Sequence, residues 1–320
     1  MKTALYCNHF AAFHLLGHLT QTGQLSLVCL PGKDCPMYVE AELLCRMRQI
    51  PLVCYEDGEE QLSNALREHG IDLAIVFTFP HRLSGSLCQT PAHGTWNLHG
   101  SPLPAYRGPD PLFWQIRKGE SKAGLTLHRA SARIDAGEIF ACTTTDISPV
   151  EIKGSLFDKI AQLAPDLVSR LIQQLDNGEE LKLTAQNDKL ASEQKRPTLE
   201  DLIIRWDSMD ASEVARLIHA SNPDYGGALT WIRGTEVRML EAESFHCRTP
   251  LNAKPGCIIH APDDPNLYVV CAKDSYIRVN VLSSANAIAT GARLKVMFGL
   301  RSGELFADSP QASLPAQAGC

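Results

Sequence analysis

Residues 73–77 read Leu73-Ala74-Ile75-Val76-Phe77, five apolar residues in a row. A short, continuous apolar run predicts a strand that is buried on both faces of its sheet. Strands of this kind occur where helices cover both faces, so the stretch favours a parallel sheet inside an α/β domain.

The segments before this run alternate between strand and helix patterns. Strands are predicted at Thr3–Cys7, Leu25–Leu30 and Pro51–Cys54, and helices at Phe10–Thr22, Met37–Gln49 and Glu60–His69. This alternation predicts a Rossmann-like, mostly parallel sheet with helices on both faces. The first strand-to-helix turn contains no glycine, and the sequence has neither the dinucleotide fingerprint nor a Walker loop, which disfavours a dinucleotide-dependent dehydrogenase.

The segments after the run extend the sheet and then change in character. Further strands are predicted at Gly94–Leu98, Gly124–Arg129 and Ile139–Asp146, with a helix beginning near Pro109. A long helix over Ile152–Leu175 should be kinked or broken near Pro165. After a polar stretch and one helix (Ala211–Ala220), short β segments follow at Ala228–Arg233, Val237–Ala242, Gly256–His260, Leu267–Cys271 and Ile277–Leu282.

The spacing of those β segments, with turn residues between them, predicts a small β-barrel, OB-like, or a sandwich. The expected organisation is therefore an α/β catalytic domain over residues 1–180 and a linker over 181–203. A β-barrel-like domain should follow over 204–307, with a flexible tail over 308–320.

The composition restricts the partners and the compartment. The 320 residues carry 30 basic and 36 acidic side chains, a net charge of −6 that disfavours a polyanionic partner. Several of the eleven cysteines, including Cys29, Cys54 and Cys271, fall in apolar strand-like runs, which indicates buried, reduced thiols in a cytoplasmic protein. No apolar run approaches the length of about 18 residues that crosses a membrane.

The residue types with the clearest chemistry lie in Asn97-Leu98-His99-Gly100-Ser101-Pro102-Leu103-Pro104-Ala105-Tyr106-Arg107-Gly108. Asn97 and His99 are two residues apart in a predicted strand, so their side chains leave from the same side. They stand at the carboxyl end of the strand, where open α/β sheets bind their ligands. A second piece, Arg133-Ile134-Asp135-Ala136-Gly137, supplies a carboxylate.

An amide, an imidazole and a carboxylate suit acyl transfer. Asn97 can donate to an oxyanion, and His99 can move a proton or hold the developing charge. Asp135 can raise the pKa of His99 and accept a proton from an attacking amine. Taken alone, an Asn-x-His pair is common and Asp135-Ala136-Gly137 is an ordinary tight turn, so both pieces are needed for this hypothesis.

Other functional interpretations of single residues fit the sequence less well. A serine hydrolase with Ser101 as nucleophile fails because Pro102 has no N–H for an oxyanion hole. His14 and His18 are spaced like metal ligands on a helix, but the glutamate of H-E-x-x-H is missing, so a helix surface is favoured. The loop Thr78–Leu83 either lines a pocket for a planar ring or packs on the core.

The motif N-L-H-G-S-P-L-P-A-Y-R-G, followed by G-L-T-L-H-R and R-I-D-A-G-E-I, resembles the 10-formyltetrahydrofolate-dependent formyltransferase family, which includes methionyl-tRNA and sugar N-formyltransferases. Arg196–Trp206 and Asn222–Ala228 look like the start of that family's C-terminal domain. By resemblance, the catalytic residues are Asn97, His99 and Asp135. The residues that the resemblance places around the pterin are Phe79, His81, Arg82, Leu83, Ser131, Arg133 and Ile134.

The resemblance implies direct transfer from 10-formyltetrahydrofolate to a neutral primary amine, without a metal. In this scheme Asn97 and a protonated His99 stabilise the oxyanion, while Asp135 keeps His99 charged and takes the amine proton. The sequence departs from the family at Pro102, where leucine is usual, and at Gly226, where proline is usual.

The acceptor that the sequence favours is a small amine such as an amino-sugar nucleotide. The tRNA-specific relatives carry a basic insertion after the second strand, whereas Pro31–Glu40 is short and roughly neutral here. Nucleic acid is therefore disfavoured as a partner. Methionyl-tRNA formyltransferase and formyltetrahydrofolate hydrolase stay open as alternatives, and so does a homodimer.

Overall fold

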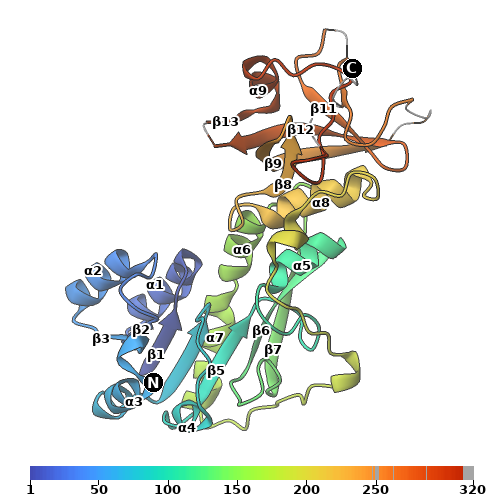
Figure 1. The fold of residues 1–320 in the computed structure, drawn as a ribbon. Helices are drawn as coiled ribbons and strands as arrows, with labels where there is room; N and C mark the ends of the chain where they lie inside the picture. The colour runs from blue at the N-terminus through green and yellow to red at the C-terminus, as the bar shows by residue number, and fades with distance from the viewer. Residues whose placement is uncertain (247, 249–251, 262, 286, 313–320) are drawn as a thin grey trace. The chain divides into compact units, whose positions relative to one another are not determined.

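A seven-stranded sheet in the order β3-β2-β1-β4-β5-β6-β7 forms the centre of the N-terminal part of the chain (Figure 1). In this computed structural model, residues 1–246, 248, 252–261, 263–285 and 287–312 are described. The strands are β1 (Thr3–Cys7), β2 (Leu25–Leu30), β3 (Leu52–Cys54), β4 (Leu73–Phe77), β5 (Thr95–His99), β6 (Lys122–Arg129) and β7 (Ile139–Asp146). The first five in spatial order are parallel, whereas β6 is antiparallel to both β5 and β7.

Helices cover both faces of this sheet, as Figure 1 shows. Ala4 and Tyr6 of β1 belong to one apolar cluster with Leu62 and Leu66 of α3 and Leu87 of α4. Because side chains alternate along a strand, the residues between them point to the opposite face. In chain order, the helices up to residue 176 are α1 (Phe13–Gln21), α2 (Tyr38–Arg48), α3 (Glu59–Glu68), α4 (Gly85–Cys88), α5 (Pro111–Lys118), α6 (Lys153–Ala161) and α7 (Ala164–Asp176).

The predicted mostly parallel, Rossmann-like sheet is confirmed. All five residues of β4 are buried, as its unbroken apolar run indicated. The long helix predicted over Ile152–Leu175 is broken as expected, since α6 ends at Ala161 and α7 carries Pro165 in its first turn. The short helix α4 and four single 3-10 turns were not predicted; the turns are η1 (Phe10–Ala12), η2 (Tyr55–Asp57), η3 (Asp188–Leu190) and η4 (Leu199–Leu202).

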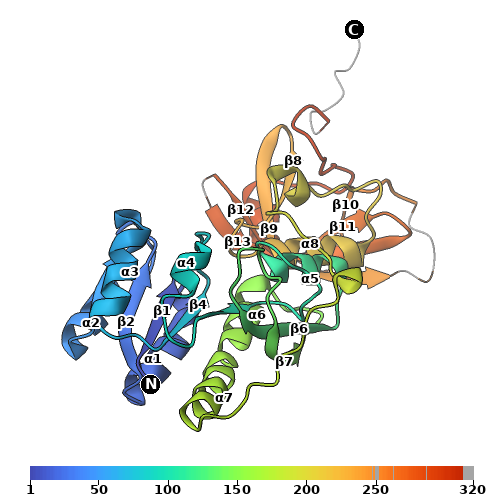
Figure 2. The same ribbon diagram turned by 90° about the horizontal axis from the view of Figure 1, so that it is seen from below.

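A second, antiparallel sheet follows in the order β10-β11-β12-β9-β8, with β13 paired to β12. Figures 1 and 2 show α8 lying against this sheet, and its contacts are with β9, β12, β8 and β11. The elements are α8 (Ala211–Ser221), β8 (Ala228–Ile232), β9 (Thr235–His246), β10 (Ile258–Ile259), β11 (Leu267–Cys271), β12 (Ser275–Ser284), β13 (Ala287–Thr290) and α9 (Gly291–Met297).

A short segment near residue 306 bridges both edges of the second sheet. Leu305 pairs with Cys257 beside β10, and Ala307 pairs with Trp231 of β8 through two N–H to carbonyl bonds of 3.0 and 2.9 Å. The sheet is thereby curled toward a barrel, which agrees with the OB-like prediction. The strand β13 and the helix α9 were not predicted, and the predicted tail lies outside the described residues from 313 onward.

The chain divides into two compact units. One comprises Met1–Pro111, Lys122–Asp146 and Phe157–Lys195, and the other Leu112–Ser121, Ile147–Leu156 and Arg196–Cys320. Across the described ranges, no helix is both long and apolar enough to span a bilayer. The nine cysteines in those ranges are free thiols, and eight of them are buried.

The loop after β5 packs directly on β6. The Thr126 hydroxyl donates to the Ser101 carbonyl at 2.6 Å and accepts the Leu103 N–H at 3.2 Å. A Cβ atom added at Gly124 would stand 2.6 Å from the backbone nitrogen of Pro102. Strand β6 therefore fixes the backbone that follows His99, and it can do so only with glycine at position 124.

We expect Gly124→Ala to reduce the free energy of unfolding by about 1–3 kcal/mol, because the backbone of Pro102 cannot yield to the added methyl group. Urea unfolding followed by circular dichroism measures this change. Gly17→Ala is the matched control: it lies inside α1 with open space around it, so alanine should stabilise by about 0.5–1 kcal/mol. A Gly124→Ala protein as stable as wild type would contradict the packing described.

Candidate active site

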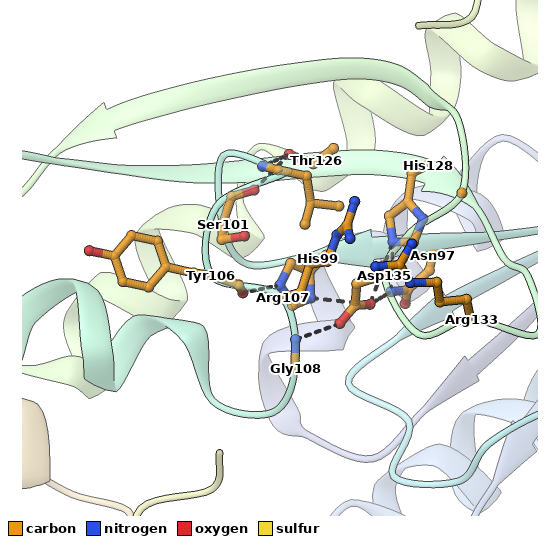
Figure 3. Close-up of polar contacts among 12 residues, drawn as sticks. Asn97, His99, Ser101, Tyr106, Arg107, Gly108, Thr126, His128, Arg133 and Asp135 are labelled. Atoms are coloured by element: carbon orange, nitrogen blue, oxygen red, sulfur yellow. Dashed lines mark hydrogen bonds and ion pairs between the residues drawn. The ribbon is translucent and has the colours of Figure 1, made fainter. Parts of the chain in front are cut away.

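Strand β5 presents Asn97 and His99 on one side of the sheet, near its carboxyl end. Its neighbour β6 runs antiparallel, with Asn97 paired to His128 and His99 to Thr126. Residues directly opposite on antiparallel strands have adjacent side chains. The imidazole of His128 therefore lies beside the amide of Asn97 and near the imidazole of His99 (Figure 3).

Asp135 reaches these side chains from the loop between β6 and β7. Its Oδ1 atom lies 3.2 Å from Asn97 Nδ2, 3.5 Å from His99 Nδ1 and 3.7 Å from His128 Nε2. Its Oδ2 atom accepts the backbone N–H of Gly108 at 2.9 Å. One carboxylate, 9% exposed, is thus shared by three side chains and a backbone donor (Figure 3).

The backbone of this loop is tightly constrained. Asp135 has a φ of 50°, in the left-handed region that aspartate tolerates better than most residues. A Cβ atom at Gly137 would lie 1.9 Å from the carbonyl oxygen of Arg129, so only glycine fits there. Glycine at position 137 is therefore required by the close approach of Arg129, and not only by the geometry of a turn.

The hydrogen bonds fix the neutral tautomers of both imidazoles. His99 Nε2 lies 2.8 Å from the carbonyl oxygen of Tyr106, and His128 Nδ1 lies 2.9 Å from that of Arg129. A carbonyl only accepts, so each of these nitrogens carries a proton. The remaining nitrogen of His128 accepts from Asn97 at 3.1 Å, whereas that of His99 faces Asp135 with a lone pair.

Burial lowers the pKa of the His99 imidazole below its ordinary value of 6.5, although Asp135 and the Tyr106 carbonyl act to raise it. The carboxylate thus has the predicted sign of effect on His99, but burial outweighs it. A pKa below 6.5 favours the uncharged ring at neutral pH, whereas the resemblance implied a protonated His99.

Asp135 stays ionised in spite of its burial. Burial acts to raise the pKa of its carboxyl group, but the neighbouring imidazoles of His128 and His99 and the Gly108 N–H bring it down to about 2. The site at neutral pH therefore holds a carboxylate facing the lone pair of His99. One proton placed between them would be stabilised by both groups.

The loop after β4 begins beside β5, because Phe77 is paired with Leu98. Phe79 is half-buried and packs against the apolar cluster, edge-on to Tyr55 at 5.4 Å. His81 is exposed and stacks on Tyr55 with ring centroids 4.7 Å apart. The loop therefore combines the two predicted roles, since Phe79 packs on the core and His81 presents a ring to solvent. Of the other residues predicted to bind the cofactor here, Arg82 is exposed and Leu83 is half-buried.

The second predicted cofactor segment leads into Asp135 and is exposed. Ser131 donates its hydroxyl to the Arg133 carbonyl at 2.7 Å, which closes the turn. Arg133 forms an ion pair with Asp188 at 2.7 Å, and Ile134 is 42% exposed.

The residues considered above as a serine nucleophile and as metal ligands have structural partners. The Ser101 hydroxyl is fully buried and donates to the Ala105 carbonyl at 2.7 Å. His14 lies 2.7 Å from Asp158 and His18 lies 2.7 Å from Ser169, so both tie α1 to other helices. Within the part of the chain that the structure describes, no group of three or more potential ligands could hold a metal ion.

His128 lies in the motif G-L-T-L-H-R, but no role for it was predicted from the sequence. The signal that identifies it is the antiparallel register of β5 and β6, which places His128 directly opposite Asn97. Local sequence patterns do not specify that register, and the change from parallel to antiparallel pairing at β6 was not predicted. His128 positions Asn97 by accepting one of its two amide protons.

The chain matches two family models. One, described as formyl transferase, matches residues 46–172, and the other, described as formyl transferase, C-terminal domain, matches residues 197–293. A methionyl-tRNA formyltransferase of Agathobacter rectalis is 31% identical over 231 residues, which cover 72% of this chain and 73% of that protein.

Two solved structures share the fold. HypX from Aquifex aeolicus, in complex with tetrahydrofolic acid, has a TM-score of 0.69 at 20% identity over 94% of this chain. This chain spans only 48% of the length of that protein. An N-formyltransferase from Helicobacter canadensis, in complex with folinic acid and dTDP-3-aminofucose, has a TM-score of 0.65 at 14% identity, covering 87% of this chain and 98% of its own.

We expect the His99 ring to titrate with a midpoint below 6.5 in ¹⁵N NMR spectra of histidine-labelled protein, because burial disfavours its charged form. Asp135→Asn should lower the midpoint further, since the carboxylate acts to raise it. Asp158→Asn, a like substitution beside His14, should leave the His99 midpoint in place. A midpoint above 6.5, or one that Asp135→Asn does not change, would refute this account of the electrostatics.

Proposed function

This chain belongs to the formyltransferase family, and we propose that it transfers the formyl group of 10-formyltetrahydrofolate to a primary amine of a small molecule such as an amino-sugar nucleotide. Formyl transfer itself follows from the family. The observation that carries the catalytic assignment is the convergence of Asn97 and His99 on one oxygen of Asp135.

The pair of His99 and Asp135 supplies the base. A neutral amine that bonds to the formyl carbon must lose a proton, and the lone pair of His99 Nδ1 faces the Asp135 carboxylate 3.5 Å away. Transfer of the proton to this pair gives an imidazolium next to a carboxylate, which stabilises the charge. The same proton is then available to the folate nitrogen as the bond from the formyl carbon to that nitrogen breaks.

Asn97 is the donor for the formyl oxygen, which gains negative charge as the amine attacks. Both of its amide protons are engaged, one with Asp135 and one with His128. To bind the oxyanion, Asn97 must exchange one of these bonds for the new one. Exchange with Asp135 also frees that carboxylate oxygen for the His99 proton, so oxyanion binding and proton uptake are coupled.

The residues that we propose to hold the folate lie on two loops. Phe79, His81, Arg82 and Leu83 follow β4, and Ser131, Arg133 and Ile134 precede Asp135. The exposed ring of His81 and the exposed Ile134 fit a planar heterocycle, and both loops leave the sheet near the catalytic side chains. When bound, 10-formyltetrahydrofolate supplies the formyl carbon and a nitrogen leaving group.

Charge supports a small acceptor. Binding of tRNA depends on many Lys and Arg contacts to phosphates, whereas this chain has a net charge of −6. The segment between β2 and α2 adds one basic side chain, Lys33, beside Asp34 and Glu56. Methionyl-tRNA is the second candidate acceptor, and the similarity to the Agathobacter rectalis methionyl-tRNA formyltransferase supports it.

The free thiols of the described cysteines support a cytoplasmic location.

Incubation with 10-formyltetrahydrofolate and a panel of acceptors tests the proposal. The panel contains aminodeoxy-sugar nucleotides, hydroxylated amino acids and methionyl-tRNA, and mass spectrometry identifies the products. We expect a formylated sugar nucleotide. Formylation of methionyl-tRNA with a steep salt dependence would assign the tRNA acceptor instead, and formate without a formylated product would indicate a hydrolase.

We expect His99→Ala and Asp135→Ala each to reduce the rate of transfer on the order of 10²–10⁴-fold, because each removes half of the base. His14→Ala is the matched control, since it deletes an imidazole that also pairs with an aspartate but lies on α1. Far-UV circular dichroism checks that the variants fold. Wild-type turnover in either active-site variant is the result that would overturn the assignment.

A further inference from the structure

Residues 184–194, within the predicted linker, run along both catalytic loops; we call them the strap. At one end Thr184 pairs with Ile139 through two backbone hydrogen bonds of 2.9 Å. At the other end the Arg107 N–H donates to the Ser192 carbonyl and the Gln194 N–H to the Arg107 carbonyl, both at 2.8 Å. The strap is thus paired with β7 and with the loop that follows His99.

Gln186 connects the two loops through its side chain. Its Nε2 atom donates to the carbonyl oxygens of Asp135 at 2.8 Å and of Gly137 at 2.7 Å. Its Oε1 atom accepts from Arg107 Nε at 3.0 Å and from a terminal Arg107 nitrogen at 2.7 Å. Two donors and two acceptor positions are all used, so the amide has a single arrangement in which it can be satisfied.

The bonds of Gln186 act on strained backbone. Asp135 has a φ of 50°, a conformation that costs a non-glycine residue on the order of 1 kcal/mol and persists only where the surroundings hold it. Gln186 fixes the carbonyl of Asp135 and the carbonyl two residues later. This orientation of the backbone aims the Asp135 carboxylate at Asn97 and His99.

The strap also positions His99. The Ser192 hydroxyl accepts the N–H of Tyr106 at 2.8 Å, and the Tyr106 carbonyl accepts from His99 Nε2 at 2.8 Å. A Cβ atom at Gly108 would lie 2.4 Å from the Gln194 carbonyl oxygen, which shows how closely the strap approaches this loop. The strap therefore bonds directly to the backbone of Asp135 and reaches His99 through Tyr106.

The buried charge in this region is neutralised by the strap as well. Arg107 is only 2% exposed, and its guanidinium pairs with Asp188 at 2.9 Å. Asp188 also pairs with Arg133, on the exposed turn before Asp135. A buried cation that lost its partner would be costly, so the strap is held in place by Arg107.

We propose that Gln186 is a positioning residue of the active site, which holds the carboxylate of Asp135 in register with His99. The proposal rests on the formyl transfer proposed above for its kinetic test. Gln186 acts through the backbone of Asp135 and makes no contact with substrate in this role. The predicted linker is then a working part of the catalytic unit.

Gln186→Glu tests the hydrogen bonds that the Gln186 amide donates separately from those that it accepts. Glutamate has the same size and still accepts from Arg107, but it cannot donate to the two carbonyls when ionised. Lys189→Ala is the matched control, because Lys189 is an exposed residue of the same strap whose backbone N–H bond to Asn187 does not depend on its side chain. Gln186→Ala removes both sets of hydrogen bonds.

We expect Gln186→Glu and Gln186→Ala to reduce kcat by about 10–100-fold, with KM for 10-formyltetrahydrofolate changed less than about threefold, because a misplaced base slows chemistry rather than binding. The assay follows tetrahydrofolate release with the acceptor identified from the panel. Lys189→Ala should keep the wild-type kcat. Wild-type kcat in Gln186→Glu, or an equal loss in Lys189→Ala, overturns the proposal.

The ¹⁵N titration of His99 tests the positioning without any turnover. If Asp135 moves away in Gln186→Ala, which adds no charge of its own, its carboxylate no longer raises the His99 pKa, and the titration midpoint should fall below that of wild type. An unchanged midpoint overturns the positioning role. If the wild-type protein transfers formyl to no acceptor while Gln186→Ala lowers the midpoint, the proposed function fails and the positioning role stands.

Discussion

The proposed active site depends on one buried carboxylate, that of Asp135, whose pKa is lowered by its neighbours. Asp135 receives the Asn97 amide, faces two imidazoles and accepts the Gly108 N–H. Desolvation of such a group is costly, and the two imidazoles and the Gly108 N–H offset it so far that the pKa falls to about 2. The surrounding backbone serves this arrangement: the close approach at Gly137 and the left-handed Asp135 both aim the carboxylate inward.

The fold and part of the site could be predicted from local patterns. The apolar run of β4 and the alternation before it gave the right sheet, and the two-residue spacing of Asn97 and His99 placed both on one side of β5. Asp135 was included as the carboxylate of a second motif, and the resemblance supported its role, because spacing alone cannot show that residues 38 apart lie together. The antiparallel register that makes His128 the neighbour of Asn97 was not encoded in any local pattern.

Two further properties of the site depend on the whole domain. The charge of His99 was expected to follow Asp135, yet burial decides the direction of its pKa, and burial is known only once the strands and loops are packed. The polar strap was read as a linker because its residues are hydrophilic and irregular. Its side chains are hydrophilic because they bond to carbonyls and to a buried guanidinium.

The closure of the second sheet has its own consequence. Leu305 and Ala307 occupy the outer hydrogen-bonding positions beside β10 and β8, the two strands that end the sheet. Unpaired strand edges are templates for pairing with other chains. Detachment of this segment would therefore expose hydrogen-bonding groups of β10 and of the Trp231 end of β8, while Ile203 stays paired with Leu229 of β8. The exposed groups could then pair with other chains.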